Sequence, residues 1–247
     1  MNRQLSKIIL LIVCSIFCAS LVHIGEAEDV SGDSKVYCPY MHGYRVVGIP
    51  DEEYEYNGFV HGNILDEEGS EILPQDYLLC DLSDCDGYED IIIVASVSKD
   101  WYLFGFYDRQ SSFFCEPCFE DISYYTKNDE KLIAVMANEK WGFCNRSNGN
   151  IEIPFQYDAV SCDFSNGYAI VIAAGTYSED YFLIDQQGMK TVFPDLVIPI
   201  STPNDKGELI IADQSNDPVL FGVADVNGAI IVTPCYDEEE PLYEALY

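Results

Sequence analysis

The sequence has 247 residues, 48% of them hydrophobic and 13% aromatic, with 43 acidic and 12 basic side chains and a formal net charge of −31. This length supports one compact domain with a substantial core, and the many Tyr, Phe, Ile and Val residues exclude an intrinsically disordered chain. The strong negative charge repels phosphate backbones and anionic lipid, which argues against nucleic acid and membrane surfaces as partners.

The first 27 residues have the pattern of an export signal. Arg3 and Lys7 form a basic start, residues 8–22 form an apolar run, and Ala27 ends a small-residue cleavage pattern. The run is shorter than the roughly 20 apolar residues that span a bilayer, so cleavage is expected and an uncleaved anchor is the alternative. The sequence therefore predicts a secreted or extracytoplasmic protein of the cell envelope.

Three further segments differ from the rest of the chain in composition. Residues 28–36 are acidic and lack periodicity, which predicts a flexible leader, whereas Tyr44–Gly48 has the pattern of a short strand in a partial first unit. Residues 51–56 form an acidic, tyrosine-containing loop that is expected to be solvated. Residues 238–247 are predicted to be an acidic C-terminal tail.

From residue 62 onward the chain repeats with a period of about 40 residues. A polar residue ends the first strand of each copy, at intervals of 42, 37, 40 and 40 residues: Asp66, Asp108, Asn145, Asp185 and Asp225. The residue four places upstream is aromatic in four copies and the residue two places upstream is always apolar, so both face one side of a strand. The position between them is glycine in three copies: Gly105, Gly142 and Gly222. Such periodicity predicts an array of similar units.

Each repeated position has a structural interpretation. The glycine permits close approach of a neighbouring backbone. The Asp or Asn is followed three or four residues later by glycine in every copy except the second, which predicts a hairpin turn and a different turn in that copy. A proline eight or nine residues after the Asp or Asn is expected to end the second strand, because it cannot donate to the ladder. These prolines are Pro74, Pro117, Pro154, Pro194 and Pro234.

A polar loop and then a third strand are expected to follow each proline. The third strands are nearly continuous apolar runs, as in strands buried on both faces: Ile91–Ala95, Leu132–Val135, Tyr168–Ala174 and Leu209–Ala212. Helical spacing never persists for three turns, so no helix is predicted. The result is an all-β fold of about five tandem three-stranded antiparallel meanders. They can wind into an open superhelical array, which is favoured, or close into a small propeller.

The clearest copy resembles the bacterial WG β-repeat, also called the KWG repeat. The residues that carry the resemblance are Trp141-Gly142, Asn145, Gly149, Pro154, Tyr157-Asp158, Phe164 and Gly167-Tyr168-Ala169. The resemblance extends over roughly residues 62–237, although Phe-Gly replaces Trp-Gly at Phe104 and Phe221. It implies that residues 37–237 form an all-β repeat domain of a kind that is often exported and serves as an interaction surface without a general catalytic role.

The cysteines leave two interpretations open. Eight remain after the signal, an even number that favours disulfides in an exported chain, but reduced cysteines are often small buried hydrophobes. Cys115-x-x-Cys118 has the spacing of a zinc or redox pair. A zinc site needs a second pair, and a thioredoxin-like role needs a helix start, and neither is found. A structural disulfide or a packing role is favoured.

Other candidates for chemistry are weak. The histidines after the signal, His42 and His61, lie in irregular sequence, and no serine occupies a strand-to-helix elbow. The acids around Gly87 do not fit an EF-hand, so a solvated loop is favoured over a weak calcium site: Asp81, Asp84, Asp86, Glu89 and Asp90. The glycosylation sequon at Asn145 falls in a predicted turn and would be silent in a bacterium.

No catalytic, cofactor-binding or metal-binding residue is therefore predicted, and the ligand-binding residues stay unknown. The expectation is an exported, non-enzymatic WG-repeat protein that acts as a protein–protein or surface-polymer interaction module. The alternative is an extracellular carbohydrate-binding or carbohydrate-active module, suggested by tyrosine-rich loops such as residues 51–56 and by the plentiful acids. Carboxylate pairs suited to glycoside hydrolysis are bound to occur among so many acids, so their presence does not discriminate.

Overall fold

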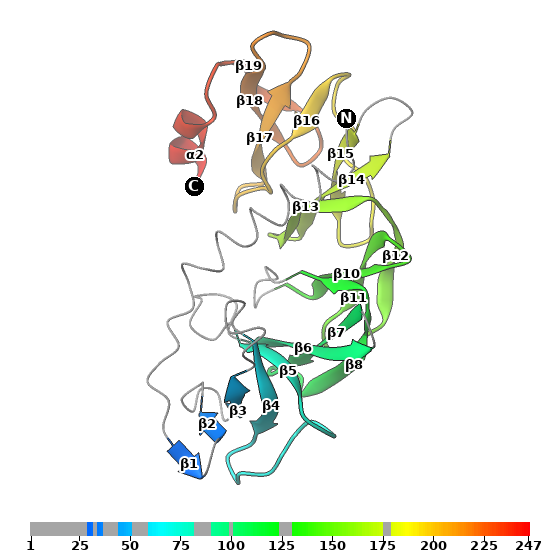
Figure 1. Ribbon diagram of the computed structural model, residues 1–247. Coiled ribbons are helices and arrows are strands. Elements are labelled where there is room, and N and C mark those ends of the chain that lie inside the picture. Colours follow the sequence, from blue (N-terminus) through cyan, green and yellow to red (C-terminus); the bar gives the residue numbers. More distant parts are fainter. Residues whose placement is uncertain are drawn as a thin grey trace. The chain divides into compact units, whose positions relative to one another are not determined.

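The computed structural model describes residues 29–31, 34–36, 44–50, 59–81, 90–98, 101–123, 130–174 and 179–247. The predicted export signal lies outside these residues, as do His42, the loop 51–56 and three of the five acids around Gly87. The chain divides into two compact units, residues 1–118 and 119–247 (Figure 1). Among the described residues, no helix has the length and apolar character needed to cross a membrane.

The first unit contains one sheet in which strands that are consecutive in sequence lie side by side. Its strands are β1 (Asp29–Ser31), β2 (Ser34–Val36), β3 (Arg45–Pro50), β4 (Phe59–Leu65), β5 (Tyr77–Asp81), β6 (Ile91–Ser98), β7 (Trp101–Asp108) and β8 (Phe113–Phe119). β1 and β2 pair with each other, and β2 pairs with β3, so the segment predicted as a flexible leader contains two short strands. Main-chain pairing, which composition does not reveal, holds them.

The described residues of the second unit form three antiparallel sheets and one short helix. The first has the order β12-β11-β10-β9, the second β13-β14-β15, and the third β16-β17-β18-β19. The strands are β9 (Asp121–Ile122), β10 (Leu132–Ala137), β11 (Lys140–Asn145), β12 (Ile151–Tyr157), β13 (Ala159–Ser165), β14 (Tyr168–Ala174), β15 (Glu179–Asp185), β16 (Val197–Pro199), β17 (Glu208–Asp213), β18 (Leu220–Asp225) and β19 (Ile230–Tyr236). The fold is therefore all-β and antiparallel as predicted, and none of these sheets closes on itself.

The apolar runs form the central, fully buried strands. Ile92 in β6, Ile133 in β10, Ile170 in β14 and Ile210 in β17 are completely inaccessible to solvent. Each strand has a neighbour on both sides, for example β9 and β11 beside β10. Consecutive residues, which point to opposite faces, are buried together, as Ile91, Ile92 and Ile93 are in β6. This confirms the prediction that these segments are buried on both faces.

The segments predicted as polar loops after the prolines contain further strands, namely β5, β9, β13 and β16. Each pairs with the following buried strand on the side away from its hairpin. The first and third sheets of the second unit consequently have four strands, where three were predicted. A buried central strand needs hydrogen-bond partners along both edges, so the chain before it is recruited even where its sequence is polar.

The repeat prolines do not end the second strand of the hairpin in β8, β12 and β19, because Pro117, Pro154 and Pro234 lie inside those strands. In β12, Ile153 is opposite Phe143 and Tyr157 is opposite Trp141, so four residues of one strand span two of the other. The prediction fails because this β-bulge takes the proline out of the regular ladder. In the regular ladder, the missing N–H of proline would have cost a hydrogen bond.

The repeat glycine provides the space for this bulge. A Cβ atom at position 142 would lie 2.6 Å from the carbonyl oxygen of Ile153, and one at position 222 would lie 2.5 Å from that of Val232. At Gly105 the corresponding contact is with the carbonyl oxygen of Cys115. The prediction of a close backbone approach is confirmed in all three glycine-containing copies.

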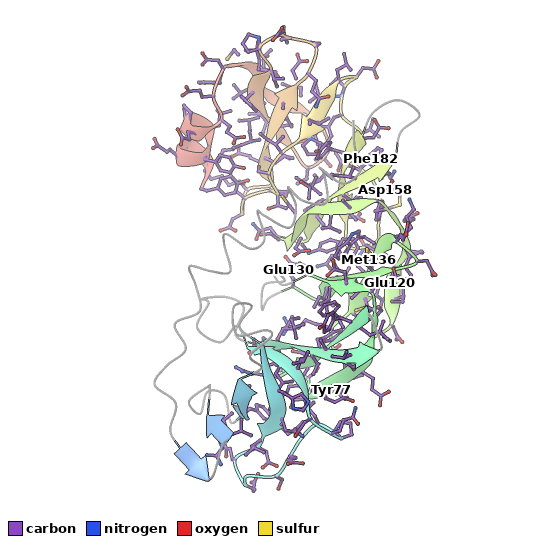
Figure 2. The ribbon with its side chains drawn as sticks, viewed as in Figure 1. Tyr77, Glu120, Glu130, Met136, Asp158 and Phe182 are labelled. Atoms are coloured by element: carbon purple, nitrogen blue, oxygen red, sulfur yellow. The ribbon has the colours of Figure 1, made fainter. Side chains whose placement is uncertain are left out.

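Two copies lack this glycine and also lack a regular second strand. Asn63 takes its place in β4, and its side-chain oxygen accepts a hydrogen bond from the Leu73 N–H at 3.1 Å. Phe182 takes its place in β15, where Figure 2 labels it. In both copies only an isolated bridge forms beyond the turn, Leu65–Glu71 and Ile184–Lys190. A side chain at this position therefore determines whether the proline-containing segment joins the sheet.

The polar residues at the strand ends form the predicted turns. The Asp225 carboxylate, for example, accepts hydrogen bonds from the N–H groups of Asn227 and Ala229, both at 2.9 Å, and Gly228 has a φ of 85°. In the copy without glycine, Ser112 takes the left-handed conformation with a φ of 55°. Asp66, Asp108, Asn145 and Asp185 make the same kind of side-chain contact with turn amides.

A short helix, α2 (Glu240–Leu246), occupies the segment predicted as an acidic tail, so the prediction of no helix is wrong. Seven residues are too few to show helical periodicity. The helix instead forms because Leu242 packs on Ile210 and Val223 of the third sheet, with Leu246 beside it. The Tyr247 hydroxyl lies 2.9 Å from the Ser201 hydroxyl and adds a polar contact.

Replacement of Leu242 by alanine is expected to lower the free energy of unfolding by about 2–3 kcal/mol, because a buried leucine is removed from this apolar cluster. Urea denaturation followed by circular dichroism measures the change. Glu244→Ala is the matched control, since Glu244 is an exposed residue of the same helix. Equal stability of the two variants would contradict a packing role for α2.

Candidate interaction surface

With the exception of Cys115 and Cys118 in β8, the candidate chemical residues from the sequence do not come together in the described part of the chain. His61 is exposed on β4. The Asp90 carboxylate accepts a hydrogen bond of 2.5 Å from the side-chain amide of Gln110, which gives it a structural contact beside the β7–β8 turn. Among the described residues there is no group of three or more His, Cys, Asp or Glu side chains that could hold a metal ion.

The Asn145 sequon lies in the β11–β12 turn. Its side-chain oxygen accepts hydrogen bonds from the Ser147 N–H at 3.0 Å and the Ser147 hydroxyl at 2.7 Å. These contacts confirm the predicted role of Asn145 in the turn.

Sequence reasoning missed a buried carboxyl group at Asp163, in β13. The Ser123 hydroxyl donates a hydrogen bond to one oxygen of this carboxyl, and the other oxygen is enclosed without a hydrogen-bond partner among the described residues. Burial raises the pKa of Asp163 to about 6, and the Ser123 hydrogen bond opposes this effect. The sequence shows only an aspartate between Cys162 and Phe164. This pattern suggests a buried acid only once the segment is known to be a strand.

A second buried acid connects the first and second sheets of the second unit. Glu130 is only 4% exposed, and its carboxylate accepts hydrogen bonds from the Gly167 N–H at 3.0 Å and the Gln186 side-chain amide at 3.3 Å. Figure 2 labels Glu130 beside β10. These partners come from turns of the second sheet, so the contacts of Glu130 are those of a residue that holds neighbouring sheets together.

An open hollow in the described part of the first unit is lined by Pro74, Gln75, Tyr77, Ser96, Glu116 and Pro117. Two of the repeat prolines meet here. The ring of Tyr77, labelled in Figure 2, is 6% exposed and lies 5.6 Å from that of Phe114. It is therefore part of the core and does not offer a ring face on which a ligand could stack.

Three strongly exposed apolar side chains follow β15 in residues 189–196, here called the apolar loop. Val192 is 82% exposed, Met189 67% and Leu196 59%. In the glycine-containing copies the corresponding residues belong to β8, β12 or β19. Here Phe182 occupies the glycine position, with the Lys190 ammonium 3.4 Å from its ring centre. Beyond the Ile184–Lys190 bridge the loop does not join the ladder. Met189, Val192 and Leu196 face solvent, whereas Phe193 packs against the apolar cluster of the second and third sheets.

Contacts with the neighbouring sheet fix the position of the apolar loop. The Thr191 hydroxyl donates a hydrogen bond of 2.8 Å to the Val226 carbonyl in the β18–β19 turn, and the Val192 carbonyl contacts Gly228. The same turn carries the Asp225 carboxylate, and hydrogen bonds from the N–H groups of Ala229 and Asn227 lower the pKa of this group. The surface therefore combines exposed apolar side chains with a nearby permanent negative charge.

Comparison with known protein families identifies the repeat unit. Residues 141–177 match the family model described as a WG containing repeat. This chain carries a WG repeat. The matched WG repeat begins at Trp141 in β11, continues through β12 and β13, and includes β14, so it starts in one sheet and ends in the next. A comparison with curated proteins gives no significant match.

The position of the WG repeat explains why consecutive sheets pack together. Ile153 and Tyr157 of its first half share one apolar cluster with Phe164, Ala169 and Val171 of its second half. The rings of Phe143 and Phe164 meet edge to face at 4.9 Å. One WG repeat thus supplies both sides of a sheet-to-sheet interface.

Proposed function

We propose that this WG-repeat protein is an exported, non-enzymatic binding module that recognises a partner protein through the apolar loop. The exposure of Met189, Val192 and Leu196 supports this proposal most directly. Contact of a large apolar side chain with water is unfavourable, and a partner that covers the side chain removes this cost. Clusters of exposed apolar residues are therefore typical of interaction sites.

The charge of the chain defines the chemistry of the partner. A net charge of −31 attracts basic proteins, accelerates their encounter and makes the association sensitive to salt. The expected partner therefore presents an apolar patch within a basic surface. The apolar loop supplies the contact area, and the surrounding carboxylates supply the long-range attraction.

The test is capture of a partner by the immobilised protein from the extracytoplasmic fraction of its source, with two matched variants. Val192→Asp places an acid in the apolar loop, and Val97→Asp places one at an exposed valine in the first unit. We expect Val192→Asp to reduce the captured amount at least tenfold and Val97→Asp to leave it unchanged. Because Val192 is exposed, both variants should keep the circular dichroism spectrum of the wild type.

Two outcomes would overturn the proposal. The first is that the wild type captures nothing above an empty support. The second is that Val192→Asp captures as much as Val97→Asp, which would place the contact elsewhere. Capture that persists in high salt would contradict only the electrostatic attraction of a basic partner and would leave the role of the apolar loop standing.

A carbohydrate-binding or carbohydrate-active module remains the second candidate, and exposed tyrosines support it. Tyr236 is 39% exposed on β19, and the ring of Tyr243 in α2 lies 5.6 Å from the ring of Tyr247, the residue that follows the helix. Tyrosine rings are amphipathic contact surfaces for sugars. A glycan array, together with an assay for hydrolysis of common polysaccharides, tests this candidate, and no signal in either would reject it.

A further inference from the structure

The bulge in β8 holds the two cysteines of the Cys115-x-x-Cys118 motif. Gly105 contacts the carbonyl oxygen of Cys115, as Gly142 contacts that of Ile153 and Gly222 that of Val232. The three bulges are therefore equivalent. Cys115 corresponds to Ile153 and Val232, and Cys118, three residues later, corresponds to Gln156 and Cys235.

The bulge shortens the distance between its ends. Ile153 and Tyr157 pair with Phe143 and Trp141, which are two residues apart on β11. Two residues of a strand span about 7 Å, whereas the four residues from Ile153 to Tyr157 would span about 13 Å if fully extended. A disulfide requires Cα atoms about 4.4–6.8 Å apart, and a bulge equivalent to that of β12 shortens the span from Cys115 to Cys118 toward this range.

The two thiols differ in accessibility and are in contact. Cys115 is buried and Cys118 is exposed, and both are thiols in this structure. The Cys115 thiol donates a hydrogen bond of 3.8 Å to the Glu116 carbonyl, and it also lies within hydrogen-bonding reach of the Cys118 side chain. This side-chain contact is the main cause that lowers the pKa of Cys118 to about 7. An exposed, partly ionised thiol beside a buried second thiol is the arrangement of a nucleophilic and a resolving cysteine.

We propose that Cys115 and Cys118 form a redox-active dithiol that closes reversibly by exchange with a low-molecular-weight disulfide. The Cys118 thiolate attacks one sulfur of the small disulfide, forms a mixed disulfide and releases one thiolate. Cys115 then loses its proton to solvent and attacks the Cys118 sulfur, which releases the second thiolate and leaves the Cys115–Cys118 disulfide. Two electrons pass to the small disulfide, which becomes two thiols after protonation.

The probe is glutathione disulfide, added to the reduced full chain in buffers with increasing ratios of oxidised to reduced glutathione. The reaction is stopped with acid, alkylated with iodoacetamide and digested with trypsin without reduction. Residues 110–127 form one tryptic peptide that contains both cysteines. As the ratio rises, we expect this peptide to be two hydrogens lighter and to carry no alkyl group. If the disulfide is reduced before alkylation, the peptide should carry two alkyl groups.

The variants identify the role of each sulfur. Cys115→Ser should trap glutathione on Cys118, and Cys118→Ser should abolish the reaction of this peptide. Cys235→Ser is the matched control, because Cys235 has Val232 in the position of Cys115, and its removal should leave the closure unchanged. The proposal is overturned if the wild-type peptide keeps two alkyl groups at every ratio, retains glutathione, or links Cys115 to a cysteine outside the motif.

Discussion

Replacement of Gly142 by alanine should lower the free energy of unfolding by about 3 kcal/mol. The added Cβ would lie 2.6 Å from the Ile153 carbonyl oxygen and 2.9 Å from the Phe155 nitrogen. Both are backbone atoms, so no side-chain rotation relieves the clash, and the bulge of β12 has to move away from β11. Urea denaturation followed by the fluorescence of Trp141, the neighbouring residue, measures the loss.

Gly69→Ala separates the steric effect from the conformational one. Gly69 has a φ of 81°, but a Cβ at this position would meet no atom within 4 Å. Its replacement should therefore cost only about 1 kcal/mol, which is the strain of a left-handed alanine. If Gly142→Ala proves no more damaging than Gly69→Ala, the close approach of the two backbones at Gly142 is not what the repeat glycine provides.

Replacement of Asp163 by asparagine should stabilise the protein above pH 7 by up to about 3 kcal/mol. The pKa of Asp163 is about 6 in the folded chain and 3.8 as an ordinary aspartate. Each pKa unit corresponds to about 1.4 kcal/mol, and the difference of about two units gives this limit. Asparagine keeps an acceptor for the Ser123 hydroxyl but removes the buried charge.

The pH dependence has a definite sign. Between pH 3.8 and about 6 the folded protein binds more protons at Asp163 than the unfolded chain does, so this group makes stability fall as pH rises through that window. Above pH 6 its unfavourable contribution is constant. The advantage of Asp163→Asn should therefore grow from pH 4 to pH 6 and then level off, as thermal melts in a series of buffers would show.

Asp195→Asn is the control for net charge, since Asp195 is exposed. It removes one negative charge without changing a buried group, and its effect on the melting temperature should be small throughout this range. An Asp163→Asn variant that behaves like Asp195→Asn at every pH would show that the carboxyl of Asp163 is solvated.

Much of the architecture could be predicted from the sequence because its signals are local. The apolar runs of β6, β10, β14 and β17 predict buried strands, and the Asp or Asn at the end of each hairpin strand predicts the turn that it forms. The glycine pattern at Gly105, Gly142 and Gly222 predicts a close backbone approach, and the structure shows one at each. All of these depend on a residue and its neighbours within a few positions.

Features that depend on distant partners could not be predicted in this way. The prolines were expected to end strands, because proline cannot donate to a ladder. The sequence of one strand does not show that the paired strand has a glycine, and this glycine is what admits the bulge that accommodates the proline. The helix α2 forms because the third sheet offers Ile210 and Val223 to Leu242. The strands β9 and β16 form because the buried strand beside each has a free edge.

The candidate site depends on both kinds of information. The sequence determined by itself that Phe182 stands where three other copies have glycine, and that apolar residues follow at Met189, Val192 and Leu196. Only the tertiary structure decided that these three side chains face solvent, because exposure depends on the contacts that each side chain makes in the folded chain. Phe193 of the same loop packs against the core. Local patterns thus determined the repeating unit, and the packing between distant segments decided where one copy departs from it and leaves apolar surface exposed.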